Sequence, residues 1–153
     1  MGRGGHTMEA LALVDLLGAE FDYLYMIGVL DNLSAKKIRV PGRRVPVFAP
    51  RLLPQDSRFL SVLRALMTLL LSFLYFALFR PRVVISCASG LTVPIFYSAR
   101  ILGIKTVYIE NMASVDALSM TGRLLLGNVD LFLVQWESLA SHIPGVTYGG
   151  QLL

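Results

Sequence analysis

The start of the chain has the composition of a phosphate-binding loop. Gly4 and Gly5 lead into an amphipathic helix that we expect at residues 7–17, with His6 beside the loop and Glu9 in the first helical turn. Glycines let several backbone N–H groups approach an anion, and the start of a helix carries partial positive charge. Such a loop normally follows a buried β-strand, so we expect that a first strand is missing here or comes from another molecule.

A second loop of small residues and a polar pair follow two later apolar runs. Ser89 and Gly90 come after the run at residues 83–86, and Glu110 and Asn111 come directly after the next run. The carboxyl ends of parallel strands meet at one edge of a sheet, where α/β folds bind their ligands. We therefore expect both loops and the polar pair to lie together at one such edge.

Helix-like and strand-like patterns alternate along the chain, which predicts one α/β domain with a mainly parallel, Rossmann-like sheet covered on both faces. We expect the strand at residues 83–86 to be buried on both faces. Ser57 and Thr92 are expected to cap the helices that follow them. The expected helices cover residues 7–17, 58–79, 92–103 and 118–126, and the expected strands cover residues 21–27, 45–49, 83–86, 106–109 and 131–134.

The net charge of +4 hides an uneven distribution along the chain. Residues 32–105 contain 12 of the 14 basic residues but a single acid, Asp56. A basic segment next to a very apolar helix indicates an anionic membrane surface, with a solvated basic loop as the alternative. Only Phe48 and Phe59 are interspersed with the basic cluster, so nucleic acid is not an expected partner. The single cysteine, Cys87, excludes an internal disulfide.

The helix expected at residues 58–79 is apolar on all sides, with Arg64 as its only charge after Phe59. At ~1.5 Å per residue it is about 30 Å long, which matches the hydrocarbon core of a bilayer. A helix that connects two strands of one sheet cannot cross to the far side of a membrane, so we expect it to lie in the interface or in a subunit contact. The side expected to cover the sheet comprises Leu60, Leu63, Met67, Leu70 and Leu74, and the outward side comprises Phe59, Val62, Leu66, Leu69, Phe73 and Phe76.

Eight short motifs occur in order along essentially the whole chain. They are Gly4-Gly5-His6-Thr7-Met8-Glu9, Asp31-x-x-Ser34-x-x-Lys37, Arg51-x-x-x-Gln55-x-Ser57, Arg80-Pro81-Arg82-Val83-Val84-Ile85-Ser86, Gly90-x-x-Val93-Pro94, Val107-Tyr108-Ile109-Glu110, Leu118-Ser119-x-x-Gly122-Arg123-Leu124-Leu125 and Asp130-x-Phe132-x-Val134-Gln135-Trp136. The set resembles the membrane-associated, acceptor-binding subunits of the two-subunit UDP-GlcNAc transferase of dolichol-linked oligosaccharide synthesis. It is also similar to subunits of bacterial exopolysaccharide glycosyltransferases and, more distantly, to the N-terminal half of MurG.

This resemblance implies the N-terminal half of a GT-B glycosyltransferase. A separate catalytic subunit would bind the sugar nucleotide, while this chain would dock on the membrane and hold a polyprenyl-diphosphate-linked saccharide. The implied location is the cytoplasmic face of the plasma membrane in a prokaryote, or of the endoplasmic reticulum in a eukaryote. No cofactor or tightly bound metal is implied for this half.

Glycosyl transfer needs a base near the attacking hydroxyl, and cations or N–H dipoles near the diphosphate. We expect His6 or Glu110 to be the base, although each could instead have a structural role, and Glu9 to be only a first-turn carboxylate favoured by the helix dipole. Gln135 and Trp136 are expected either at the partner interface or in the core. The expected phosphate- and acceptor-binding residues are Gly4, Gly5, Thr7, Ser89, Gly90, Thr92, Asn111 and Arg51.

The chain departs from the family pattern in two places. We expect that the usual N-terminal membrane helix and first strand are missing from this sequence through a truncation or a wrongly assigned start, and residues 87–90 read Cys-Ala-Ser-Gly where relatives often carry Asn-Gly-Pro-Gly. An alternative function is a membrane adaptor that recruits the catalytic subunit without touching substrate. A dinucleotide-binding domain is disfavoured, because Gly2-x-Gly4-x-x-Thr7 lacks the third glycine of that motif.

Overall fold

The computed structural model describes residues 5–50 and 57–153, in which helices and strands alternate as expected. The helices are α1 (Gly5–Leu17), α2 (Asn32–Lys37), α3 (Arg58–Phe79), α4 (Thr92–Ile101), α5 (Met120–Leu125) and α6 (Glu137–His142). The strands are β1 (Leu24–Gly28), β2 (Arg43–Val47), β3 (Val83–Cys87), β4 (Lys105–Ile109), β5 (Leu131–Val134) and β6 (Thr147–Tyr148). Of these elements, α2, α6 and β6 were not predicted from the sequence.

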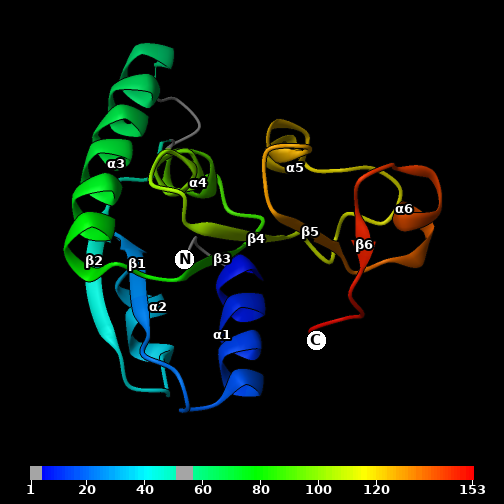
Figure 1. Cartoon of the computed structure of the whole chain (residues 1–153), viewed down its shortest axis with the longest axis horizontal. Helices are drawn as coiled ribbons and strands as arrows, with labels where there is room; N and C mark the ends of the chain where they lie inside the picture. Colours follow the sequence, from blue (N-terminus) through cyan, green and yellow to red (C-terminus); the bar gives the residue numbers. More distant parts are fainter. Residues whose placement is uncertain (1–4, 51–56) are drawn as a thin grey trace.

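All strand pairs are parallel, and they form two sheets of order β1-β2 and β3-β4-β5-β6. In Figure 1 the strands follow one another across the molecule, with α1 and α2 on one side of them and α4 and α5 on the other. Within the described ranges β1 and β3 do not pair with each other, so the sheet is divided between them.

Strand β3 is more exposed than predicted. The side chains of Val83 and Ile85 are 45% and 42% exposed, so the expectation that this strand is buried on both faces is wrong. The physical reason is its position in the sheet, because among the described strands β3 pairs only with β4. The core lies further along, around Phe96, Tyr108 and Phe132.

The predicted boundaries of α3 and β5 are confirmed, and Ser57 caps α3 by accepting a 3.2 Å hydrogen bond from the N–H of Leu60. Thr92 is not an N-cap as predicted. It is the first residue of α4, and its hydroxyl group lies 2.6 Å from the hydroxyl group of Ser86 at the end of β3.

Helix α3 buries its small polar side chains and exposes its apolar ones. Thr68 and Ser72 are completely buried together with Phe76, while most of the leucines are exposed. The predicted sheet-covering side is therefore wrong, since Leu63, Met67, Leu70 and Leu74 face outward. By length and composition α3 could cross a membrane, with a mean hydropathy of 2.1 and only 17% of the window buried. An apolar surface of this size does not face water in most soluble monomers.

Hydrogen bonds connect this side of α3 to the segment after β2 and to helix α4. The hydroxyl group of Thr68 accepts from the N–H of Phe48 at 3.0 Å and donates to the carbonyl of the same residue at 2.5 Å. From α4, the hydroxyl group of Ser98 donates to the carbonyl of Leu69 at 2.8 Å. The helix thus packs through these polar contacts and through Phe76 in the core, while its exposed leucines remain available for another surface.

We predict that Thr68→Val lowers the free energy of unfolding by about 2 kcal/mol, because it leaves the N–H and carbonyl of Phe48 without their partner. Ser72→Ala is the matched control. Ser72 lies one turn along the same buried side, but its hydroxyl oxygen has no hydrogen-bond partner within residues 5–50 and 57–153. Urea unfolding followed by circular dichroism measures both variants, and equal losses would contradict the role assigned to Thr68.

Candidate functional site

The start of α1, the end of β1 and the loop after β3 meet at one edge of the molecule. The hydroxyl group of Thr7 lies 2.8 Å from that of Ser34, which donates a hydrogen bond to the carboxylate of Asp31 just after β1. A Cβ atom on Gly28 would lie 3.8 Å from Asp31 and 3.9 Å from Leu91, in the loop after β3. The structure therefore brings α1 close to the end of β1, and the loop after β3 close to that same end.

The predicted phosphate-binding residues differ in accessibility at this edge. Thr7, Ser89 and Thr92 are buried, and the hydroxyl groups of Thr7 and Thr92 lie within hydrogen-bond distance of other side chains of the fold. Gly5 and Gly90 are exposed, and a Cβ atom on either would meet nothing within 4 Å. Exposed backbone of this kind is what an anion needs in order to approach. Gly4 and Arg51 lie outside the described residues.

Glu110 is completely buried, and its carboxylate anchors the segment that follows β4. One oxygen accepts hydrogen bonds from the N–H of Asn111 at 2.8 Å and from the hydroxyl group of Tyr108 at 3.3 Å. The other accepts from the N–H of Ser119 at 3.1 Å and from its hydroxyl group at 3.2 Å. Burial, and then the neighbouring carboxylate, raise the pKa of Tyr108. This geometry favours the structural alternative for Glu110.

Glu9 is the carboxylate that sequence reasoning underestimated. Helix α1 begins at Gly5, so Glu9 lies in its second turn, and the expectation of a first-turn carboxylate is wrong. Its side chain is only 3% exposed. One oxygen accepts from the N–H of Met112 at 2.8 Å and from the side-chain amide of Gln135 at 3.4 Å. The other oxygen is buried and has no partner among the described residues.

His6 lies at the start of the same helix, half-buried, with Nδ1 buried and without a hydrogen-bond partner in the described parts of the chain. Cys87 at the end of β3 is a poor nucleophile, because burial raises the pKa of its thiol to about 12. No group of three or more His, Cys, Asp or Glu residues that could hold a metal occurs within residues 5–50 and 57–153.

The structure places Gln135 inside the fold, where its side chain joins three segments. Its amide nitrogen donates to the carbonyl of Glu110 at 2.9 Å, and its oxygen accepts from the N–H of Leu152 at 2.9 Å. Trp136 is half-buried, and its indole N–H donates to the carbonyl of Met112 at 2.5 Å. Core packing therefore accounts for Gln135, whereas a partner contact for Trp136 stays a prediction.

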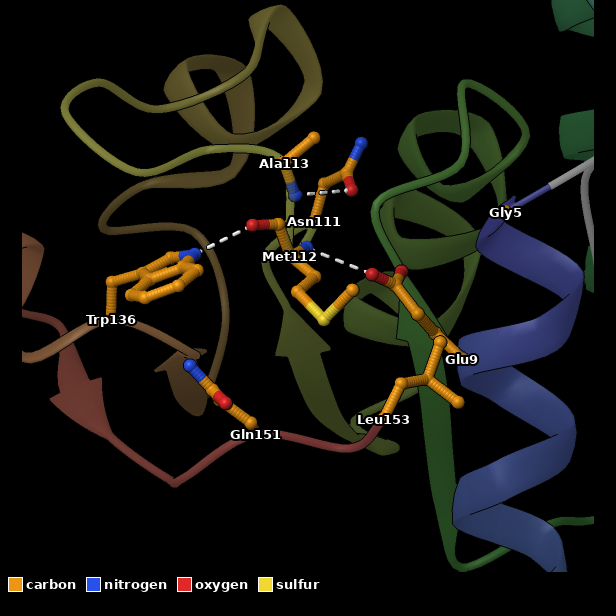
Figure 2. A pocket seen from close by; sticks show the side chains of 8 residues that line it. All are labelled: Gly5, Glu9, Asn111, Met112, Ala113, Trp136, Gln151 and Leu153. Atoms are coloured by element: carbon orange, nitrogen blue, oxygen red, sulfur yellow. Dashed lines mark hydrogen bonds between the residues drawn. The ribbon is translucent and has the colours of Figure 1, made fainter.

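A cavity of about 420 Å³ opens at the carboxyl ends of β4 and β5. In Figure 2 Glu9 and Trp136 stand on opposite sides of it, with Met112 between them. The side chain of Asn111 accepts a hydrogen bond from the N–H of Ala113 at 2.9 Å, which orders this wall of the cavity. The complete lining is Gly5, Glu9, Asn111, Met112, Ala113, Trp136, Gln151 and Leu153.

Comparisons with known proteins agree with this fold. Residues 1–152 match the family model described as Oligosaccharide biosynthesis protein Alg14 like. The UDP-N-acetylglucosamine transferase subunit ALG14 of Candida albicans is 32% identical over 173 residues, covering 100% of this chain and 76% of the relative. The human subunit of the same name is 32% identical, covering 99% of this chain and 80% of the relative.

Among solved structures, MurG of Acinetobacter baumannii superposes with a TM-score of 0.66 at 17% identity. The match covers 98% of this chain but only 42% of MurG. This confirms the predicted fold, one half of a GT-B glycosyltransferase. The family match over nearly the whole length and the two relatives above 30% identity show that the chain belongs to the Alg14-like family of oligosaccharide biosynthesis proteins.

Proposed function

We propose that this chain is the acceptor-binding, membrane-docking subunit of a two-subunit glycosyltransferase. The complex transfers GlcNAc, or a related sugar, from a UDP-sugar to a polyprenyl- or dolichyl-diphosphate-linked saccharide. The observation that carries this proposal is that a chain of the Alg14-like family corresponds to 42% of MurG. The relatives that match over the whole chain are each named as a subunit of a UDP-N-acetylglucosamine transferase, which supports a second subunit as the binding site of the sugar nucleotide.

In the proposed reaction, a hydroxyl oxygen of the acceptor attacks the anomeric carbon of the donor sugar. The bond from that carbon to the diphosphate breaks, and UDP leaves with the bonding electrons. His6 Nδ1, which has no hydrogen-bond partner in the part of the chain that the structure describes, takes the proton of the attacking hydroxyl. Backbone N–H groups at the Gly5 end of α1 face the acceptor's diphosphate. Glu110 keeps the segment after β4 in place instead of sharing the base role.

Helix α3 is proposed to dock the complex on an anionic membrane surface. Its outward side is apolar, and the guanidinium group of Arg43 lies 5.2 Å from the ring of Phe79 in its last turn. Arg80 and Arg82, both exposed, follow the helix directly. An apolar helix side with basic residues at its end is typical of helices that lie in the headgroup region. The proposed location is the cytoplasmic face of the plasma membrane or of the endoplasmic reticulum.

The decisive experiment measures transfer of labelled GlcNAc from UDP-GlcNAc to a polyprenyl-diphosphate-GlcNAc acceptor. We expect activity only when the chain is combined with its sugar-nucleotide-binding partner. His6→Ala in that complex is expected to lower kcat about 100-fold or more. His142→Ala is the matched control, because the chain's other histidine is exposed on α6.

Appreciable transfer by the purified chain alone would contradict the proposal. Full activity of the His6→Ala complex would remove His6 from the reaction. If that complex also stayed active after truncation of Glu9, the adaptor alternative would be preferred.

A further inference from the structure

We infer that the cavity between α1 and the segment after β4 binds a sugar ring of the acceptor, and that Glu9 accepts a hydrogen bond from one of its hydroxyl groups. This inference rests on the proposed function and adds a binding residue to it. Glu9 contacts the substrate in this role, while His6 stays the proposed proton acceptor.

The first argument is the unpartnered oxygen of Glu9. Glu9 is only 3% exposed, and one of its carboxylate oxygens accepts hydrogen bonds from the N–H of Met112 and the side-chain amide of Gln135. The second oxygen is buried without a donor among the described residues, although the side chain lines the cavity. A buried carboxylate oxygen without a donor is unfavourable, and a ligand hydroxyl group in the cavity removes that cost.

The second argument is the chemistry of the cavity walls. Met112, Trp136 and Leu153 provide apolar surface, and the indole of Trp136 is fixed in place by its hydrogen bond to Met112. In Figure 2 the indole of Trp136 lies across the cavity from the carboxylate of Glu9, the side chain of Met112 lies between them, and Leu153 is next to Glu9. A sugar ring has an apolar face of C–H groups and an edge of hydroxyl donors. Its face can therefore pack on the apolar side chains while one hydroxyl group donates to Glu9. The volume of about 420 Å³ also suits a ring of this size.

The third argument is charge, which separates the sugar from the diphosphate. The carboxylate of Glu9 repels an anion and attracts a hydroxyl donor, so the diphosphate does not lie beside Glu9. Gly5 lines the same cavity at the start of α1, where backbone N–H groups favour an anion. The acceptor therefore extends from Gly5 to Glu9, with its diphosphate at Gly5 and its sugar ring beside Glu9.

Tryptophan fluorescence tests this directly, because Trp136 is the chain's single tryptophan and lines the cavity. We expect N-acetylglucosamine to produce a saturable change in the emission of the wild-type chain. In Glu9→Gln, which keeps the size of the side chain, the apparent Kd should rise about tenfold or more. Glu20→Gln, at an exposed position after α1, is the matched control and should bind as the wild type does.

A second measurement needs no variant. Deoxy analogues of N-acetylglucosamine, each lacking one hydroxyl group, should bind the wild type unequally, with one analogue about tenfold weaker than the others. Equal weakening by all analogues, no saturable change, or an unaltered Kd in Glu9→Gln would each overturn the inference. Sugar binding without transferase activity in the complex would refute only the proposed function, whereas transferase activity with an unaltered Glu9→Gln titration would refute only the inference.

Discussion

Glu110→Ala is expected to lower the free energy of unfolding by about 3–5 kcal/mol, because it removes a buried carboxylate and leaves several partly buried donors without their acceptor. The N–H groups of Asn111 and Ser119 both donate to this carboxylate, and the hydroxyl groups of Tyr108 and Ser119 do so as well. Urea unfolding of the variant measures the loss. Glu137→Ala, at an exposed position on α6, is the control and should change stability by less than about 0.5 kcal/mol.

Glu110→Gln separates this structural role from a catalytic one. An amide group presents N–H donors where one carboxylate oxygen accepted hydrogen bonds, so an anchoring role predicts a clear loss of stability in this variant too. A fully stable Glu110→Gln protein whose complex lacks transferase activity would instead identify Glu110 as a base. The two outcomes require both a melting curve and a transfer assay.

Gly122→Ala is expected to cost about 2–3 kcal/mol, because the new methyl group has no space beside Glu110. A Cβ atom on Gly122 would lie 2.0 Å from the second carboxylate oxygen of Glu110 and 3.3 Å from the ring of Phe132. The carboxylate cannot move away cheaply, since the N–H and hydroxyl groups of Ser119 hold that oxygen. Gly90→Ala is the stability control, because a Cβ atom there meets nothing within 4 Å.

A double variant tests whether the crowding is indeed with Glu110. In a Glu110→Ala background the space beside residue 122 is open, so adding Gly122→Ala should cost much less than it does alone. Additive losses in the double variant would show that the methyl group is opposed by something other than this carboxylate.

The strands other than β6 and the boundaries of the long helix follow from local sequence. Residues 131–134 are a short apolar run, as β5 requires, and Ser57 and Pro81 mark the two ends of α3. The orientation of α3 could not be predicted, because the helix is apolar on all sides. Its buried side is defined by distant partners of two small polar residues, such as Phe48 for Thr68.

The partners of the two carboxylates, Glu9 and Glu110, could not be predicted from local sequence either. The contact of Glu9 with Met112 joins residues 103 positions apart, and no local pattern signals it. The helix also begins at Gly5, earlier than expected, which moves Glu9 out of the first turn. Glu110 was located correctly at the end of β4, but its use as an anchor depends on Ser119, which caps α5. Position along a strand is encoded locally, whereas the partner of a side chain is not.

The division between β1 and β3 gives α3 a mechanical importance beyond its proposed docking on a membrane. The two groups of strands share no hydrogen bonds in the described residues, and α3 joins them by packing on β2 at one side and on α4 at the other. Any tilt or change of depth that a bilayer imposes on α3 is therefore transmitted to both groups at once. If α3 docks on a bilayer as proposed, the thickness and headgroup composition of that bilayer would change the spacing between the two groups of strands.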